Sequence, residues 1–462
     1  MSEARWAEIE FGETELGDVR RRRRLIEMAT TLAKRPTGSL PEACEDGAQL
    51  KAVYRFFAHD EIEPSAMLAS HVQATTDRLQ QERLVLAVQD TTVLDYTHHP
   101  ATTGLGAVHD ARHQGMFVHR TLAITPERVP LGLLGQEVWT RDPAQVGKRA
   151  TRKQRPIAEK ESHKWLTSVA AVSAARACCP GTRFVSVGDR EADVYDLFAQ
   201  PRPAGVDLLV RAAWDRGVEE PQAHLWAAVE AAPVAGTLTV TVPPKPGQPA
   251  RTADLTVRFR PVALKPPRHR TAEHLPSAAV WAVWVVEDAP PTDGTPVEWL
   301  LLTTGRVRSA RQALTRVSWY ACRWGIEAWH KVLKSGCRIE ARQLESADRL
   351  RRCLTLYSVV AWQIVFATML ARAAPDLPCS VLLDPEEWQA LSCVIHRSAF
   401  PPTTPPTLQQ AVRWIARLGG FLDRRSDGDP GPIVLWRGFQ HLADHTTMPH
   451  LLKPALSSRK CG

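Results

Sequence analysis

Three acidic residues that lie far apart in the chain have sequence surroundings typical of metal-binding carboxylates. Asp90 follows the short apolar run of residues 84–88, and Asp189 follows a similar run at residues 184–187. Such runs predict buried strands, and the ligands of open α/β sheets gather at the carboxyl ends of strands. The third residue, Glu327, lies in a predicted helix. Each aspartate also has an ordinary structural interpretation, because Asp90 can simply end its strand and Asp189 can cap the helix that follows it.

The helix around Glu327 gives the most specific pattern. At 3.6 residues per turn, four polar side chains fall on one stripe of this helix: Tyr320, Arg323, Glu327 and Lys334. The two cations suit phosphate oxygens, the carboxylate suits a hard metal ion, and the phenol can hydrogen-bond to a phosphate. The alternative interpretation is a surface helix with several salt bridges.

Oxygen ligands without a Cys/His cluster favour hard divalent cations over zinc. Asp90, Asp189 and Glu327 together therefore predict a site for two Mg²⁺ or Mn²⁺ ions about 4 Å apart. One ion would activate a water or a DNA 3′-hydroxyl as the nucleophile, and the other would stabilise the leaving 3′-oxygen. The predicted chemistry is in-line displacement at a phosphodiester.

The elements that must position these residues follow a regular order. The first part of the pattern contains strands at residues 84–88, 116–124 and 129–140, a helix at 157–177, a strand at 184–187, a helix at 194–198 and a strand at 207–210. Three strands followed by alternating helices and strands is the order of an RNase H-like fold. We therefore expect an α/β protein, with an RNase H-like mixed-sheet catalytic core and helices on both faces of the sheet.

The remaining segments are predicted to interrupt and flank this core. Residues 232–304 contain four β-type runs joined by Pro-rich turns, which predict a β-rich insertion. Long helices follow at residues 309–372, and a further helix is expected at 408–418. The first 65 residues are also predicted to be helical.

The charge of the chain favours a polyanionic partner. The net charge is +8, and five consecutive arginines stand near the amino terminus: Arg20, Arg21, Arg22, Arg23 and Arg24. Like charges at this spacing on a helix repel each other, whereas the phosphates of nucleic acid would neutralise them. The alternative is a solvated charged face.

A membrane anchor and a disulfide framework are not indicated. The nine cysteines include no Cys-x-x-Cys pair, which is typical of reduced thiols in a cytosolic protein. Residues 354–370 approach the length of a membrane span, but Ser358, Gln363 and the flanking arginines favour a buried helix. We expect a soluble, cytoplasmic protein without a membrane partner.

The helical pattern resembles the signature of a known family. The spacing Tyr320-x2-Arg323-x3-Glu327-x6-Lys334 is similar to the YREK signature of the insertion-sequence-four family of bacterial DDE transposases, of the transposon-five type. The resemblance runs nearly the full length of the chain, from about residue 6 to residue 445. It includes both aspartate motifs (90–92 and 189–193), the end of a β insertion (298–303), an amino-terminal DNA-binding domain (16–18 and 52–57) and a carboxy-terminal dimerisation region (414–421).

The resemblance implies a role for each site residue. Asp90, Asp189 and Glu327 resemble the metal-binding DDE triad. Tyr320, Arg323 and Lys334 resemble the residues that grip a phosphate of the transposon end. Trp299 resembles the residue that stacks on an extruded base while a DNA hairpin forms.

The resemblance also implies a domain organisation. The expected regions are a helical DNA-end-binding domain (residues 1–65), the first part of the catalytic core (66–235), the β-strand insertion (236–304), the second part of the core with the YREK helix (305–375) and a helical dimerisation region (376–462).

The function implied is that of a cut-and-paste DNA transposase. It would bind inverted transposon ends as a homodimer, nick each end, form a hairpin and transfer the ends into target DNA. Such an enzyme would work in the cytoplasm, associated with the nucleoid. Two alternatives remain from the residues: a catalytically silent transposase-derived DNA-binding protein or inhibitor, and an RNase H-like nuclease that only hydrolyses.

Overall fold

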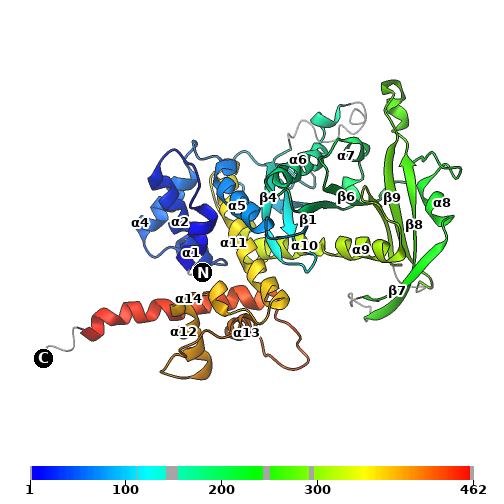
Figure 1. Ribbon diagram of the computed structural model, residues 1–462. Helices are drawn as coiled ribbons and strands as arrows, with labels where there is room; N and C mark the ends of the chain where they lie inside the picture. Colours follow the sequence, from blue (N-terminus) through cyan, green and yellow to red (C-terminus); the bar gives the residue numbers. More distant parts are fainter. Residues whose placement is uncertain (1–2, 111, 142–154, 243–249, 291–295, 458–462) are drawn as a thin grey trace.

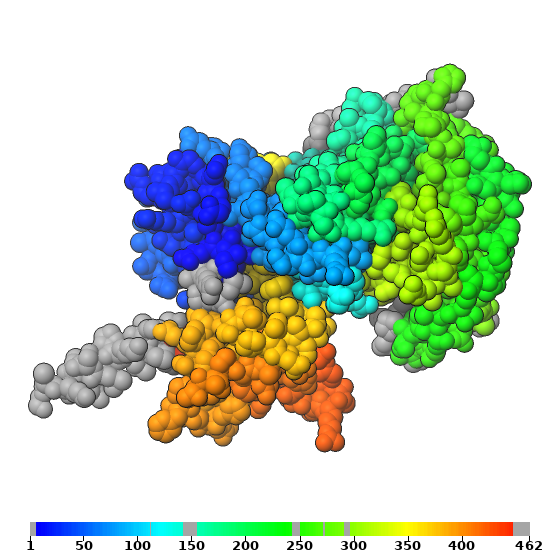
Figure 2. Space-filling view, viewed as in Figure 1, coloured from blue at the N-terminus to red at the C-terminus, as the bar shows by residue number. Residues whose placement is uncertain are grey.

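The structure is a computed structural model, and it describes residues 3–110, 112–141, 155–242, 250–290 and 296–457. Helical regions at the two ends of the chain lie together at one end of the molecule, and a large mixed sheet extends away from them (Figure 1). The space-filling view shows the same arrangement, with the strands of the central part of the chain at the far end (Figure 2).

The amino-terminal region is helical, as expected, and contains α1 (Glu3–Phe11), α2 (Val19–Lys34), α3 (Leu40–Ala43), α4 (Gly47–Phe57) and α5 (Pro64–Leu79). Asp18 begins α2, because its side chain accepts a hydrogen bond from the backbone N–H of Arg20. The apolar stripe of α2, which starts at Leu25, is buried. Helices α3 and α4 are separate, since Ser39 and Asp46 each cap a new helix. We did not predict α1 or α5.

One mixed sheet organises the centre of the molecule. Its strands are β1 (Leu84–Asp95), β2 (Gly106–Ala107), β3 (Gln114–Ile124), β4 (Pro130–Trp139), β5 (Arg183–Gly188), β6 (Val206–Arg211), β7 (Val234–Val242), β8 (Arg251–Leu264), β9 (Ala278–Glu287) and β10 (Glu298–Thr303). The order is β2-β3-β1-β5-β6-β10-β9-β8-β7, and β4 also pairs with β3. The β1–β5 and β5–β6 pairs are parallel, and the other pairs are antiparallel.

The β-type runs predicted between residues 232 and 304 form β7 to β10. They do not fold as a separate sheet. Because β10 pairs with β6, these strands extend the sheet of the central part of the chain.

Helices cover both faces of the sheet. On one face lie α6 (His163–Cys178), α7 (Tyr195–Ala199) and α8 (Leu225–Glu230); on the other lie α9 (Ala310–Ala321), α10 (Trp324–Lys331) and α11 (Ala347–Ala373). Successive side chains of a strand point to opposite faces. In β6, accordingly, Leu209 packs in the cluster of α9 to α11, while Leu208 and Val210 pack in the cluster of α6 to α8. The helix expected from residue 157 begins as a short 3₁₀ turn, and α6 starts six residues later.

The apolar segment at residues 354–370 lies within α11. Of the described helices, α11 alone is long and apolar enough to cross a membrane, but 78% of its most apolar window is buried inside the protein. This burial confirms the predicted core helix.

The carboxy-terminal region adds α12 (Pro385–His396), α13 (Leu408–Leu418) and α14 (Pro432–Ser457). The bounds of α13 are those predicted, and α12 was not predicted. These helices pack on the end of α11, and α14 also contacts α2.

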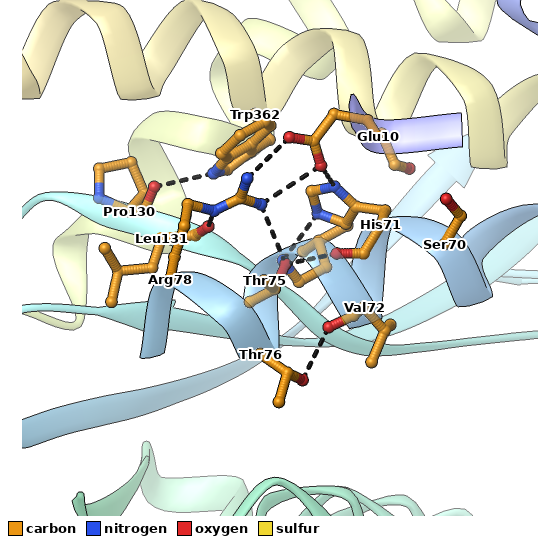
Figure 3. A network of polar contacts seen from close by, with 12 residues as sticks. Glu10, Ser70, His71, Val72, Thr75, Thr76, Arg78, Pro130, Leu131 and Trp362 are labelled. Atoms are coloured by element: carbon orange, nitrogen blue, oxygen red, sulfur yellow. Dashed lines mark hydrogen bonds and ion pairs between the residues drawn. The ribbon is translucent and has the colours of Figure 1, made fainter. Parts of the chain in front are cut away.

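A buried polar network joins α1 to the rest of the protein (Figure 3). The Glu10 carboxylate accepts a hydrogen bond from Nη1 of Arg78 at 2.7 Å and lies 2.5 Å from Nδ1 of His71. The backbone N–H of Leu133 donates to Nε2 of His71 at 3.0 Å, so the histidine must carry its proton on Nδ1. The Arg78 guanidinium lies 4.5 Å from the centre of the Trp362 ring. The network therefore connects α1, α5, β4 and α11.

Two buried arginines make further connections to the amino-terminal helices. Arg342 donates to the carbonyl oxygen of Pro36 at 2.6 Å. Arg352 donates to the carbonyl oxygens of Ile62 at 2.7 Å and Phe57 at 3.1 Å. Both guanidinium groups satisfy carbonyls that end helices or form loops, and these bonds fix the helical region against the residues that follow the sheet.

Candidate active site

Asp90 lies on β1 next to Asp189, which directly follows the neighbouring parallel strand β5. We expected Asp90 just beyond a short strand, and this was wrong, because β1 continues to Asp95 by pairing with β3. The pairing of β1 with β5 ends at Val88 and Val187. Each aspartate stands two residues beyond this pair, and parallel strands lie about 4.8 Å apart. The register therefore places the two carboxylates on the same face, toward α9, α10 and α11.

Asp189 also caps a short helical turn. Its side chain accepts a hydrogen bond from the backbone N–H of Glu191 at 2.9 Å, so the structural interpretation of this residue holds alongside the chemical one. Burial raises the pKa of the Asp189 carboxyl, and the charges of Asp90 and Glu191 raise it further. Two adjacent carboxylates of this kind repel each other, and a cation between them would relieve the repulsion.

Asp90 is neutralised from the side of α10. Oδ2 of Asp90 lies 3.5 Å from Nδ1 of His330 and 4.0 Å from Nη1 of Arg323. Burial alone would raise the pKa of the Asp90 carboxyl, but the His330 contact and the Arg323 charge outweigh burial and lower it. His330 is itself buried, and burial lowers the pKa of its imidazole.

Glu327 joins this group through the same arginine. The Arg323 guanidinium forms an ion pair with the Glu327 carboxylate, and the side chain of Glu327 is 47% exposed. Arg323 therefore lies between Glu327 and Asp90. The structure brings the three acidic residues into one region, with Arg323 between two of them.

The helix that carries Tyr320, Arg323, Glu327 and Lys334 is not continuous, contrary to the prediction. Helix α9 ends at Ala321, α10 begins at Trp324, and a π-helical turn (Val332–Gly336) follows α10. The first three side chains still converge, but the extra residue of the π turn changes the direction of Lys334.

Lys334 lies apart from the other three side chains. Its Nζ donates to the carbonyl oxygen of Val93 at 2.5 Å and lies 3.3 Å from Oε1 of Glu340. Val93 is three residues beyond Asp90 on β1, so the ammonium group is displaced along the strand from the acidic residues.

An aromatic group borders the acidic residues. The rings of Trp299 and Tyr320 lie 5.2 Å apart, and the rings of Trp299 and Trp324 lie 6.1 Å apart, both edge to face. Trp324 is 52% exposed. Burial raises the pKa of the Tyr320 phenol, although the charges of Arg323 and Arg211 act in the opposite direction.

Three residues of this site were not predicted: Arg211, Trp324 and His330. Arg211 ends β6 next to Tyr320, and its pKa is lowered by burial. Trp324 and His330 lie inside the signature segment. Their helical spacing from Arg323 and Glu327 could have indicated that they belong to the same site. Nothing in the local sequence of Arg211 distinguishes it.

The five arginines of α2 have different environments. Arg20 pairs with Asp18 and Arg24 pairs with Glu27. Arg21 is held by Glu61 at 2.8 Å, by the carbonyl of Leu16 at 3.0 Å and by His59 at 2.9 Å. Arg22 and Arg23 form no ion pair with any described residue, and Arg23 is exposed. None of the five lies near the acidic residues; they belong to a separate surface.

The acidic side chains supply only part of a donor set for a metal ion. Within the ranges that the structure describes, no group of three or more His, Cys, Asp or Glu side chains is arranged to hold one. The half-buried pair Asp90 and Asp189 fits a hard cation, since both are oxygen donors and their mutual repulsion contributes to the raised pKa of Asp189. Glu327 can complete the set only when its carboxylate leaves Arg323. The eight described cysteines are all free, in agreement with the predicted reduced thiols.

Two family models match the chain, one near each end. Residues 3–62 match a model described as transposase DNA-binding, and they comprise α1 to α4. Residues 359–449 match the transposase Tn5 dimerisation domain, which begins within α11, earlier than residue 376 where we expected this region to start. The sheet and its acidic residues lie between the two matched segments.

Proposed function

Because the chain belongs to the Tn5-like transposases of the insertion-sequence-four family, we propose that it is a cut-and-paste enzyme of the DDE type. Its partners are DNA and a second copy of the chain. In this proposal the homodimer binds the inverted ends, nicks one strand at each end, forms a hairpin and joins the ends to target DNA. It acts at the nucleoid in the cytoplasm.

One observation carries this proposal: Asp90 on β1 lies beside Asp189, which directly follows β5, and Arg323 links Asp90 to Glu327. Acidic residues from two strands and one helix thus meet at the carboxyl ends of parallel strands, where open α/β sheets bind their ligands. Displacement at a phosphodiester needs such a cluster, because the reaction develops charge on the attacking and leaving oxygens.

The strand order supports an RNase H-like core. The segment β4-β3-β1 is antiparallel, and β5 and β6 then add in parallel to β1. We propose that β1 to β6 with α9 to α11 form this core, and that β7 to β10 are the insertion. The proposed domains are residues 1–65, 66–235, 236–304, 305–375 and 376–462.

The residues around the acidic cluster have distinct proposed tasks. Asp90, Asp189 and Glu327 would hold two Mg²⁺ or Mn²⁺ ions, which would lower the pKa of the attacking hydroxyl and stabilise the leaving oxygen. His330 orients the carboxylate of Asp90 through its Nδ1 atom. When Glu327 turns toward the cluster, Arg323 becomes available to a phosphate oxygen.

The aromatic group next to the cluster supports the hairpin step. Trp299 offers a ring on which an extruded base can stack, and the exposed Trp324 extends the apolar surface toward solvent. Tyr320 can donate its hydroxyl to the same phosphate as Arg323. Lys334 would need to leave Val93 and Glu340 to reach that phosphate.

The proposal is tested with single variants that keep side-chain size: Asp90→Asn, Asp189→Asn and Glu327→Gln. Each should lower cleavage of linear DNA carrying the native ends, in Mg²⁺, by at least about a hundredfold, while the same protein still shifts that DNA in a gel. Glu191→Gln is the matched control, since this exposed carboxylate lies two residues from Asp189 and pairs with Lys164. Near-normal cleavage by any of the three variants would remove that residue from the triad. If the wild-type protein shifts the DNA in a gel but never nicks it, only the catalytically silent DNA-binding alternative remains.

A further inference from the structure

A basic pocket lies at the other end of α9 from the acidic residues. Its volume is about 610 Å³, and it is lined by the start of β5, the start of β6, the loop after β10 and the first turns of α9. Four arginines line it: Arg183, Arg306, Arg311 and Arg316. Asp207 is the one acidic residue in the lining, so three positive charges have no counter-charge there.

Both oxygens of the one carboxylate in the pocket already accept hydrogen bonds. Oδ2 of Asp207 accepts hydrogen bonds from Nε and Nη2 of Arg183, at 3.0 and 2.5 Å. Oδ1 of Asp207 accepts a hydrogen bond from the hydroxyl of Thr304 at 3.2 Å. Asp207 therefore fixes the Arg183 guanidinium in place and leaves the other three arginines unpaired.

Arg316 is the strongest sign of a missing anion. Its side chain is 95% buried, stacks 4.3 Å from the centre of the Trp319 ring, and donates from Nη2 to the carbonyl of Arg306 at 3.2 Å. Its Nε is buried without a hydrogen-bond partner, and the residue forms no ion pair with any residue in the described ranges. Burial, followed by the charge of Arg183, lowers the pKa of this guanidinium. Buried charges are costly unless paired, and a bound anion would supply the pair.

Gly305 keeps the floor of the pocket open. A Cβ atom at this position would lie 3.2 Å from Nη2 of Arg183 and 3.4 Å from Nη2 of Arg316. Both guanidinium groups therefore approach the same side of the glycine. A side chain there would occupy the space in which their donors converge.

We propose that this pocket binds a phosphate group of the DNA backbone, as a contact separate from the one proposed for Arg323. Arg183 and Arg316 form its floor, and the exposed Arg306 and Arg311 form its rim. Guanidinium groups match the geometry of phosphate oxygens and bind them through two hydrogen bonds. The inference rests on the proposed function for the identity of the polyanion.

The distance along β5 suits one continuous DNA strand. Arg183 begins β5 and Asp189 directly follows it, so six residues separate the pocket from the acidic cluster, which corresponds to about 20 Å at about 3.3 Å per residue. Phosphates of one strand advance about 3.4 Å per nucleotide along the duplex. A strand whose scissile phosphate lies at the acidic residues can therefore place a phosphate about six nucleotides away in the pocket, and this contact would fix the direction in which the strand crosses the site.

The test uses the full-length protein, two rim variants and a matched control. Arg306→Ala and Arg311→Ala remove exposed side chains that form no ion pair within the described parts of the chain, so both variants should fold normally. Arg308→Ala removes an exposed arginine of the same loop that does not line the pocket. Thermal unfolding without added anion, compared with the wild type, checks that all three variants are folded.

Two measurements follow. Inorganic phosphate, titrated without DNA, should raise the melting temperature of the wild type and of Arg308→Ala more than that of the two rim variants. With duplex DNA carrying the native ends, each rim variant should lower the slope of log K against log salt concentration by about 0.9, and Arg308→Ala should not.

The outcomes separate the alternatives. Suppose that phosphate no longer raises the melting temperature of the two rim variants, but that their slope of log K against log salt concentration for DNA equals that of the wild type. The ligand is then a free phosphate compound, and the DNA contact is refuted. If Arg308→Ala behaves like the rim variants, or if neither measurement changes, the pocket is not a binding site. If the slope changes as expected but the wild type never cleaves DNA in Mg²⁺, the pocket stands and the proposed chemistry fails.

Discussion

Arg323 and Glu327 form an ion pair across one turn at the start of α10. The same guanidinium lies 4.0 Å from Asp90, so one arginine neutralises two acidic residues of the cluster. In the proposed function a divalent cation would satisfy the same negative charges as Arg323, and its binding should release the arginine.

Replacing Arg323 by Met should reveal this exchange. Without a divalent ion, Arg323→Met should be less stable than the wild type by about 1–3 kcal/mol, because Asp90, Asp189 and Glu327 then repel one another without compensation. Mg²⁺ should raise the melting temperature of this variant more than that of the wild type. Arg190→Met, an exposed arginine beside Asp189, is the control. Equal responses to Mg²⁺ in the variant and the wild type would show that these carboxylates are not a cation site.

The arginines of α2 should divide into structural and DNA-binding residues. Arg23→Ala should leave the free energy of unfolding unchanged and lower the salt slope of end binding by about 0.9, as expected for one lost phosphate contact. Arg21→Ala should instead destabilise the fold, since Arg21 holds Leu16, His59 and Glu61 together. Urea unfolding and binding at several salt concentrations measure both effects. An unchanged slope for Arg23→Ala would place this residue outside the DNA interface.

Trp299→Ala should separate the first cleavage step from hairpin formation. Nicking needs only the acidic cluster and should persist. Loss of the stacking surface should slow hairpin formation by about 10- to 100-fold, because stacking on an aromatic ring contributes about 1–3 kcal/mol per base. Denaturing gels of end-labelled DNA resolve nicked and hairpin products. Trp299→Phe should restore much of the hairpin yield, and equal losses of both products in Trp299→Ala would contradict the stacking role.

Stability should fall in mild acid because of His71. Burial lowers the pKa of this imidazole, more strongly than the Glu10 charge raises it. Below pH of about 6.5 the unfolded chain therefore binds a proton that the folded chain excludes. The stabilisation by His71 is fully present above that pH and is lost as the pH falls toward the lower pKa of the folded state, by about 1 kcal/mol per pH unit. Urea unfolding at pH 7.5, 6.5 and 5.5 measures this slope, and His71→Gln should reduce it by that amount.

Most of the sheet could be predicted from the sequence, because its buried strands are short apolar runs bounded by turn residues. The residues predicted for the strands that became β5 and β6, and the bounds of α13, follow from such local patterns. Helices α1, α5 and α12 were missed, since tertiary packing rather than a strong apolar period stabilises them. The extension of β1 beyond Asp90 depends on its pairing with β3, which no local pattern reveals.

The proximity of some candidate residues could be predicted from the sequence, but their contacts could not. Spacing alone indicated that Tyr320, Arg323 and Glu327 share a face, and they do converge. The position of Lys334 depends on a π-helical turn, which adds a residue to the helix without any sequence signal. His330 and Arg211 enter the site through packing between α10, β1 and the end of β6, which brings together residues far apart in the chain.

Bonds from Arg78, Arg342 and Arg352 join the first helices to β4, to α11 and to the segment before α11. Under the proposed function, a DNA end bound by those helices would be presented to the acidic residues at a constant distance. That distance would set the position of the cut relative to the recognised sequence.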